Sequence, residues 1–232
     1  MIRREPLGRP VHAPTDESLE LSPAWTGGGK RLFDLGVALL CLVLLAPLLV
    51  AVALMVRLTT PGPALFRQVR LGRERRPFLL YKFRTMYDGT PSDVHREYVS
   101  KLLTDDQPPV GGRRGLYKLE DDPRITPLGR LLRRMSIDEL PQLLNVIRGE
   151  MSLVGPRPAL PWEAELMAPA DSQRFLVLPG LTGLWQVSGR SRLTMRQALD
   201  LDVEYVRRQS FALDFGILLK TVPVVLSTHG AE

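Results

Sequence analysis

The stretch from Leu35 to Val56 has no charged side chain, and this feature constrains the fold more than any other. As an α-helix it would extend about 33 Å, which is enough to cross a hydrocarbon core of roughly 30 Å. A buried core helix is the alternative, but a core helix of this length without a polar face is rare. The sequence therefore predicts a protein that inserts into a membrane.

Basic residues flank this apolar stretch on both sides. Lys30 and Arg31 precede it, and Arg57 and several arginines between residues 67 and 76 follow it. The positive-inside rule would keep both flanks on the cytoplasmic face. Pro47 lies in the middle of the stretch and would bend a helix there. We therefore expect a re-entrant helix-break-helix that enters and leaves the same side, although a spanning helix stays open because proline also occurs in spanning helices.

Two carboxylates, Asp138 and Glu139, stand side by side between a cluster of arginines and an apolar run. Apolar residues at helical spacing before them predict an amphipathic helix over 127–135, with Thr126 as its N-cap. A second helix is expected to start at the two carboxylates, because Pro141 is tolerated only near a helix start. Both carboxylates would then lie at the positive end of a helix dipole, which favours their ionised form.

Acidic residues at a helix start are most often only a cap. The neighbouring arginines, Arg133 among them, favour a second interpretation: an ionised aspartate near guanidinium groups can attack a phosphorus atom that those groups hold. Arg157 lies between two prolines, which stiffen its backbone and prepare its side chain to bind a phosphate with two hydrogen bonds.

Other basic and polar residues are candidates for a diphosphate or nucleotide site. Lys82 and Arg84 lie in a predicted strand over 78–86, and the preceding residues near 66–71 fit either a short strand or an interfacial segment. A basic face against anionic lipid headgroups would explain these charges as well. Residues 178–190 are predicted to be a glycine-rich loop suited to a nucleotide, but they contain no P-loop motif. The candidate substrate-binding residues are Lys82, Arg84, Arg133, Arg157, Trp185, Gln186 and Arg190.

Three further helices are expected, over 162–173, 198–208 and 211–226, and a short one over 95–103. The last long helix has an apolar face wide enough to lie in a membrane interface, although core packing is an equal alternative.

The composition limits the classes of partner. A net charge of +6 implies an anionic partner: a nucleic acid, a phosphorylated substrate or a membrane surface. A single cysteine, Cys41, excludes an intramolecular disulfide, and three histidines far apart in sequence argue against a zinc site. A DNA-binding helix–turn–helix over 127–148 would leave Leu35–Val56 without a role, and its second helix lacks polar base-reading residues. We therefore expect no nucleic-acid partner.

Taken in order, these blocks resemble the bacterial sugar transferases, the monotopic polyprenyl-phosphate phosphoglycosyl transferases. The resemblance extends from about Lys30 to Thr221. Its motifs are Lys30-Arg31 with Asp34, Pro61-Gly62-Pro63, residues 81–86, 122–126, 132–143, 149–158 and 179–190. Many members have serine before the proline of the apolar segment, whereas this chain has Ala46, so its bend must depend on Pro47 alone.

The resemblance implies a ping-pong enzyme that transfers a sugar 1-phosphate from a UDP-sugar to undecaprenyl phosphate and releases UMP. Asp138 would form a covalent phosphosugar intermediate, Glu139 would assist it, and Mg²⁺ beside Asp138 would neutralise the diphosphate. Arg133 and Arg157 would bind phosphate, and Arg190 would form part of the donor site. The product would begin an exopolysaccharide, capsule or O-antigen unit.

The fold expected from these features is α+β and mainly helical, with amphipathic interfacial helices and a small β element around the active site. We expect four segments in order along the chain. They are a disordered tail (1–29), a re-entrant membrane hairpin (30–60), a catalytic domain on the cytoplasmic face of the bacterial inner membrane (61–226) and a C-terminal tail (227–232). Membrane lipids are expected partners, while the sugar and any homo-oligomer stay open. A non-catalytic membrane scaffold of a polysaccharide assembly complex is the alternative, but it leaves the two carboxylates unexplained.

Overall fold

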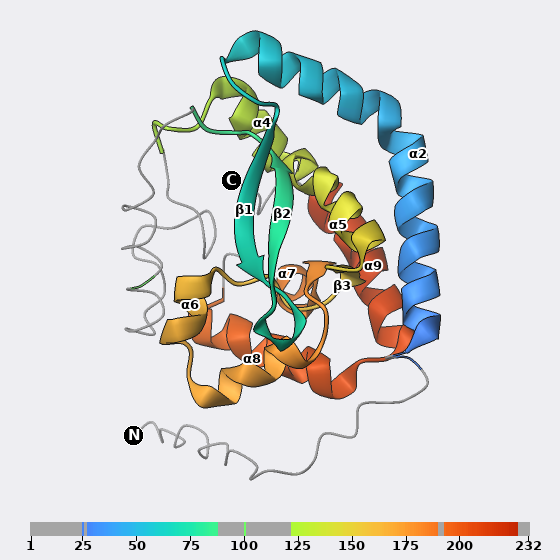
Figure 1. Ribbon diagram of the computed structural model, residues 1–232. Helices are drawn as coiled ribbons and strands as arrows, with labels where there is room; N and C mark the ends of the chain where they lie inside the picture. Colours follow the sequence, from blue (N-terminus) through green and yellow to red (C-terminus); the bar gives the residue numbers. More distant parts are fainter. Residues whose placement is uncertain (1–24, 26, 88–99, 101–121, 190–192, 227–232) are drawn as a thin grey trace, which may run out of the picture.

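The computed structural model describes residues 25, 27–87, 100, 122–189 and 193–226. The described part is mainly helical, with one long apolar helix, α2 (Gly28–Thr59), and two small two-stranded sheets. This confirms the prediction of a mainly helical fold with a small β component. Figure 1 shows α2 along the outside of the molecule, with its first turns beside α9 and its last turns near α4. The two tails and the expected helix over 95–103 lie outside the described residues, apart from Trp25, the first residues of α2 and Ser100.

Helix α2 is continuous through Pro47, so the expected break between two helices is a bend within one helix. The ribbon turns part-way along its length (Figure 1), and a proline inside a helix removes one backbone hydrogen bond and causes such a bend. By length and composition α2 could cross a membrane. Its buried residues lie toward the two ends, whereas middle residues such as Val43 and Leu44 are 71% and 68% exposed.

The first turns of α2 are held by polar contacts to three other elements. Lys30 forms a buried ion pair with Asp214 of α9 (Phe211–Leu226). Asp34 accepts a hydrogen bond of 3.2 Å from the backbone N–H of Leu153 in β3 (Ser152–Val154). Arg31 donates to the last carbonyl groups of α5 (Leu143–Arg148), which have no partner inside that helix.

The last turn of α2 is held by Arg84, which follows strand β2 (Pro77–Phe83). Its guanidinium donates to the backbone oxygens of Thr60 and Pro61 at 2.8 and 2.6 Å. Val52 and Val56 of α2 pack in a hydrophobic cluster with Phe83 and residues of α4. Both ends of the apolar helix are therefore attached to the same body.

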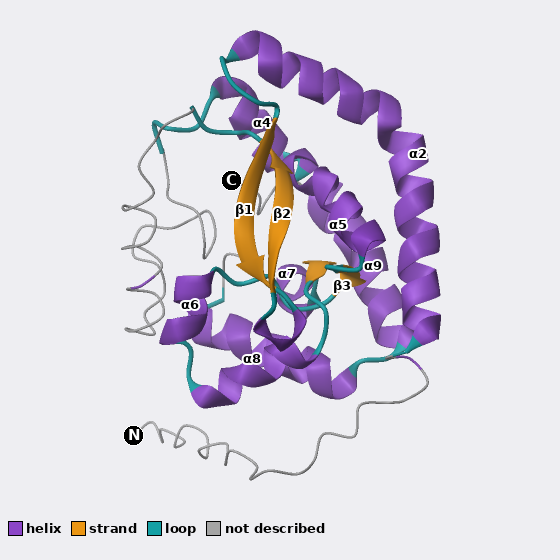
Figure 2. Cartoon of the chain, viewed as in Figure 1, coloured by secondary structure: helices purple, strands orange, loops and turns teal. Residues whose placement is uncertain are grey.

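Both predicted strands are present: β1 (Leu65–Leu71) and β2 form an antiparallel hairpin, joined by a 3₁₀ turn, η1 (Arg73–Arg75). Phe66 pairs with Lys82, and Gln68 pairs with Leu80. Because side chains alternate across a strand, Arg70, Leu80 and Lys82 lie on one face of this hairpin. Figure 2 shows the hairpin in the middle of the molecule, among the helices.

The segment predicted as a glycine-rich loop contains instead a short strand, β4 (Gly180–Thr182), and a short helix, α7 (Leu184–Ser188). β4 pairs in parallel with β3. The pairing requires glycine, because a Cβ atom on Gly180 would lie 2.1 Å from the backbone nitrogen of Gly155. The glycines therefore allow two backbones to approach closely. A glycine-rich sequence is typical both of such packing and of a loop, so the pattern alone does not distinguish the two.

Most of the predicted helices are present. Helix α4 (Pro127–Arg134) begins after Thr126, whose hydroxyl accepts from the N–H of Gly129 at 2.9 Å, as expected of its N-cap. Helices α8 (Met195–Arg208) and α9 also match their predictions. The expected helix over 162–173 is divided into α6 (Pro161–Leu166) and the 3₁₀ helix η3 (Pro169–Leu176). Pro169 causes the division, because a proline disfavours helical geometry in the residue before it. One face of α9 exposes Phe211, Phe215, Leu219 and Val222.

Candidate active site

The two neighbouring carboxylates lie in a 3₁₀ helix, η2 (Ile137–Gln142), and not at the start of an α-helix as predicted. Ser136, in the left-handed region with φ 54°, occupies the N-cap position, and its side chain makes no capping hydrogen bond. The α-helix proper, α5, begins only at Leu143, since Pro141 cannot donate the backbone hydrogen bond that a longer α-helix would need. Asp138 is nevertheless in the first turn of η2 and is only 8% exposed.

Arg133 approaches Asp138 from the last turn of α4. Its Nε donates to the hydroxyl of Thr85 at 2.8 Å, which fixes the direction of the guanidinium. Burial lowers the pKa of Arg133, and the negative charge of Asp138 opposes this shift more than that of any other neighbour. The structure thus brings together one predicted phosphate-binding arginine and the predicted nucleophile.

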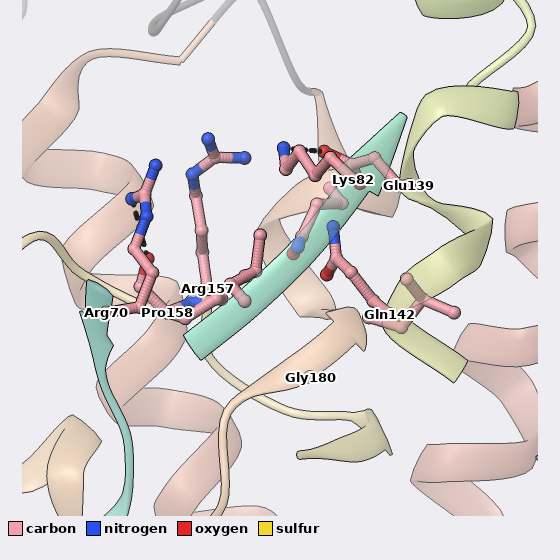
Figure 3. Close-up of a pocket in the computed structure, with 10 residues that line it drawn as sticks. Arg70, Lys82, Glu139, Gln142, Arg157, Pro158 and Gly180 are labelled. Carbon is pink, nitrogen blue, oxygen red and sulfur yellow. Dashed lines mark hydrogen bonds and ion pairs between the residues drawn. The ribbon is translucent and has the colours of Figure 1, made fainter. Parts of the chain in front are cut away.

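Glu139 forms an ion pair with Lys82 of β2, with Nζ and Oε1 2.7 Å apart. Both side chains are partly exposed, and both line a pocket between the hairpin, η2 and β4. Figure 3 shows this pair on one side of the pocket and the extended side chains of Arg70 and Arg157 on the other. Gln142 and Gln186 also line it. A site with three cations around one carboxylate is suited to an anionic substrate.

The backbone around Arg157 is held from the hairpin. Arg70 is buried, and its Nη1 donates to the carbonyl of Pro158 at 3.0 Å, while Nη2 donates to Gln68 at 2.8 Å. The sequence pattern placed Arg70 only among the basic flanks of the apolar stretch. The register of the hairpin places it on the same face as Lys82, a relationship that the strand alternation could have indicated.

The remaining predicted substrate-binding residues lie in different surroundings. Arg84 holds the end of α2 and is not among the described residues that line the pocket, although it lies only two positions after Lys82. Trp185 is buried in a hydrophobic cluster with Met195 and Leu199, whereas the adjacent Gln186 faces the pocket. Arg190 lies outside the described residues. The binding functions of all these residues stay predictions.

The donor set of this site suits a magnesium ion held largely by its substrate. Among the described residues, no group of three or more histidine, cysteine or acidic side chains gathers at one place. Asp138 and Glu139 provide adjacent carboxylates, and Mg²⁺ is commonly bound through one or two carboxylates together with substrate phosphates and water.

Comparison with known proteins identifies the family. Residues 25–228 match the family model described as bacterial sugar transferase. The chain belongs to the bacterial sugar transferase family. It is therefore a transferase, and the interpretation as a non-catalytic scaffold loses its support.

Three relatives illustrate the similarity of this transferase to known proteins. It is 39% identical over 205 residues to the exopolysaccharide production protein ExoY of Sinorhizobium fredii, covering 88% of each chain. It is 42% identical over 211 residues to the UDP-glucose:undecaprenyl-phosphate glucose-1-phosphate transferase of Caulobacter vibrioides, covering 87% of this chain and 71% of the relative. Against the UDP-galactose-lipid carrier transferase of Erwinia amylovora the identity is 42% over 202 residues, covering 87% of this chain but 41% of the relative.

Proposed function

We propose that this transferase moves a sugar 1-phosphate from a UDP-sugar to undecaprenyl phosphate and releases UMP, in the first membrane step of exopolysaccharide, capsule or O-antigen synthesis. The names of the relatives support this substrate class, since they act on UDP-glucose with undecaprenyl phosphate or as UDP-galactose-lipid carrier transferases. The observation on which the proposal mainly rests is the meeting of Glu139, Lys82 and Arg157 in one pocket, with Asp138 next to Glu139 in the first turn of η2.

The proposed reaction takes place in two displacements at one phosphorus atom. The carboxylate of Asp138 attacks the phosphorus that bears the sugar, the bond to UMP breaks, and UMP leaves with the bonding electron pair. A phosphate oxygen of undecaprenyl phosphate then attacks the same phosphorus, and the carboxylate of Asp138 is released. The product is a lipid-linked diphosphate sugar.

The surrounding cations have a clear physical task in these steps. An anionic carboxylate must approach an anionic diphosphate, and phosphoryl transfer depends mainly on charge neutralisation and alignment. Arg133 lies beside Asp138, while Arg157 and Arg70 approach the pocket from the opposite side to Lys82. Glu139, held by Lys82, is placed to orient the incoming phosphate or handle its proton. Mg²⁺ bound by Asp138 would supply additional neutralisation of the diphosphate.

We further propose that α2 is re-entrant, with both ends on the cytoplasmic face of the inner membrane. Lys30 and Asp34 near its start and Thr60 after its end are bound to the same body, in contacts to α9, β3 and Arg84. A spanning helix would separate its ends by the full thickness of the bilayer core, roughly 30 Å, on opposite sides. The exposed apolar middle of α2 and the exposed apolar face of α9 would contact lipid.

An assay of UMP release tests the proposed activity. The purified transferase in detergent or nanodiscs is given undecaprenyl phosphate, Mg²⁺ and each of a panel of UDP-sugars. At least one donor is expected to give UMP and a lipid-linked product, and Asp138→Asn should lower the rate by at least a thousandfold while the protein still inserts. Full activity of that variant would remove Asp138 as the nucleophile, and no turnover of any donor by the wild type would contradict the proposed function.

Cysteine labelling tests the topology. In a Cys41→Ser background, one cysteine is placed at residue 10 before α2 and another in place of Arg208, an exposed residue of α8. Both should resist a membrane-impermeant reagent in intact cells and react after permeabilisation. Labelling of only one of the two positions from outside would show that α2 spans the membrane.

A further inference from the structure

A buried ion pair lies behind the pocket, where no substrate can reach it. Arg174 of η3 and Asp202 of α8 are joined by a contact of 2.7 Å between Nη2 and Oδ2, and their side chains are only 2% and 3% exposed. Burying two charges costs more free energy than an ordinary contact recovers, unless their remaining hydrogen-bonding groups are also used. Additional contacts of Arg174 and Asp202 are therefore needed to offset this cost.

Both partners contact the backbone of Arg157. The Nη2 of Arg174 donates to the carbonyl oxygen of Arg157 at 2.7 Å. The backbone N–H of Arg157 favours the ionised form of the Asp202 carboxylate and lowers its pKa, against the opposite effect of burial. One member of the ion pair thus binds the carbonyl of Arg157, and the other interacts with its N–H while its own Oδ1 is buried without a hydrogen-bond partner among the described residues.

The prolines on either side of Arg157 limit how its backbone can be held, although the carbonyl of Pro156 accepts a hydrogen bond of 2.8 Å from the N–H of Gly180. Pro156 and Pro158 have no N–H to donate, so neither can join a β-ladder through its nitrogen. Arg70 holds the carbonyl of Pro158 from the hairpin side, and the ion pair holds Arg157 from the opposite side. The peptide that bears the Arg157 side chain is therefore fixed between two sets of buried contacts.

Joining η3 to α8 does not by itself require this pair. Asp171 of η3 and Arg196 of α8 form a second ion pair between the same two elements, with an N–O distance of 2.7 Å and an almost fully buried carboxylate. That pair has no contact with Arg157 among those described. It provides a matched comparison, because it links the same elements without contacting the pocket loop.

We propose that Arg174 and Asp202 are positioning residues that set the direction of the Arg157 side chain into the pocket by clamping its backbone. The proposal rests on the proposed function, in which Arg157 binds the donor phosphates. Neither residue contacts substrate, and both act only through Arg157. A guanidinium that binds phosphate with two hydrogen bonds needs its direction fixed, and displacements of about 1 Å at such a group are costly in rate.

Paired substitutions provide the kinetic test. Arg174→Met with Asp202→Asn removes both charges and leaves no unpaired buried ion, and Asp171→Asn with Arg196→Met is the matched control. The first pair should lower kcat/KM for the donor at least tenfold, mainly through a higher KM, and the control less than threefold. Equal losses for the two pairs would overturn the proposal. If the first double variant does not fold, Arg174→Lys replaces it, with at least a threefold loss expected and an unchanged kcat/KM overturning the clamp.

A double-mutant cycle separates positioning from general stability. In an Arg157→Lys background the Arg174 and Asp202 substitutions should cause less than a threefold further loss, because the residue through which they act is already changed. An undiminished loss in this background would mean that the pair acts through another part of the site.

Amide hydrogen exchange at Arg157 tests the clamp independently of turnover. The amide should exchange slowly in the wild type and at least tenfold faster in the Arg174/Asp202 variant, with little change in the Asp171/Arg196 control. Fast exchange in the wild type or no change in the variant would overturn the clamp even in an active enzyme. A wild type that releases no UMP but shows the predicted exchange would instead remove the proposed function and leave the clamp as a structural fact.

Discussion

The ammonium group of Lys82 lies 2.7 Å from Oε1 of Glu139, and this ion pair connects the central hairpin with the 3₁₀ turn that holds both carboxylates. Its side chains are 19% and 30% exposed, so solvent weakens the attraction and its contribution to folding is small. The pair instead fixes where Glu139 points relative to Arg157 across the pocket.

Replacing Lys82 should therefore affect catalysis more than stability. Lys82→Gln is predicted to lower kcat ten- to a hundredfold and to change Tm by less than about 3 °C, as expected for the loss of a partly exposed ion pair. Lys220→Gln, at an exposed position of α9, is the control and should leave both quantities unchanged. Steady-state UMP release and a thermal melt measure these effects. Similar kcat values for the two variants would show that the Lys82–Glu139 contact has no part in the reaction.

Replacing Arg84 shows whether this residue stabilises the fold or binds the substrate. Arg84→Gln removes donors to the partly buried carbonyls of Thr60 and Pro61, and a typical hydrogen bond contributes about 0.5–1.5 kcal/mol to stability. We expect Tm to fall by several degrees and the KM for the donor to change less than threefold. A donor KM raised tenfold at unchanged Tm would instead support the direct substrate binding predicted from the sequence.

Gly180 should not tolerate any side chain. In Gly180→Ala the new Cβ would meet the backbone nitrogen of Gly155 at 2.1 Å and the carbonyl of Thr182 at 2.3 Å, so β3 and β4 could not pair as they do. The variant is predicted to lose at least 10 °C in Tm or to fail to fold. Gly216→Ala in α9 meets no atom within 4 Å and should be neutral or stabilising by up to about 1 kcal/mol. Equal Tm values for the two variants would contradict the close β3–β4 pairing.

The raised pKa of the Asp202 carboxyl leads us to predict that the stability of the fold depends on pH. Burial raises the pKa of this carboxyl to about 7 from its ordinary 3.8, against the opposing charge of Arg174. The folded protein therefore binds this proton more tightly than the unfolded chain, and the resulting stabilisation is complete below about pH 4 and lost as the pH rises through about 7. The Tm of the wild type minus that of Asp202→Asn should fall between pH 5 and pH 8 in the same detergent. A difference that stays constant or grows over this range would contradict the raised pKa.

The elements that the sequence predicted correctly are those whose pattern is local. The uncharged run gives α2, the spacing of leucines gives α4 with Thr126 as its cap, and interleaved apolar and basic residues give the strands β1 and β2. Each depends on residues within one or two turns, and hydrophobic periodicity detects such relationships. The adjacency of Asp138 and Glu139, and the stiffness of Arg157, could also be inferred locally.

The contacts that define the candidate site are long-range and could not be predicted in this way. Arg84 looked like a phosphate ligand, but its partners are 23 and 24 residues earlier in the chain. Trp185 was predicted to bind substrate, but its side chain packs in a hydrophobic cluster with residues of α8. The 3₁₀ geometry of the carboxylate turn, and the Arg174–Asp202 pair behind Arg157, depend on how separate elements pack, which no local pattern specifies.

The most direct test of the central claim is mass spectrometry of the transferase trapped with a UDP-sugar donor in the absence of undecaprenyl phosphate. Rapid acid quenching and digestion should yield the peptide that spans residues 136–142 with the added mass of one sugar phosphate, located on Asp138. The adduct should be absent from Asp138→Asn and should disappear when the lipid acceptor is added before quenching. An adduct on another residue, or turnover of donor without any adduct at Asp138, would contradict the account.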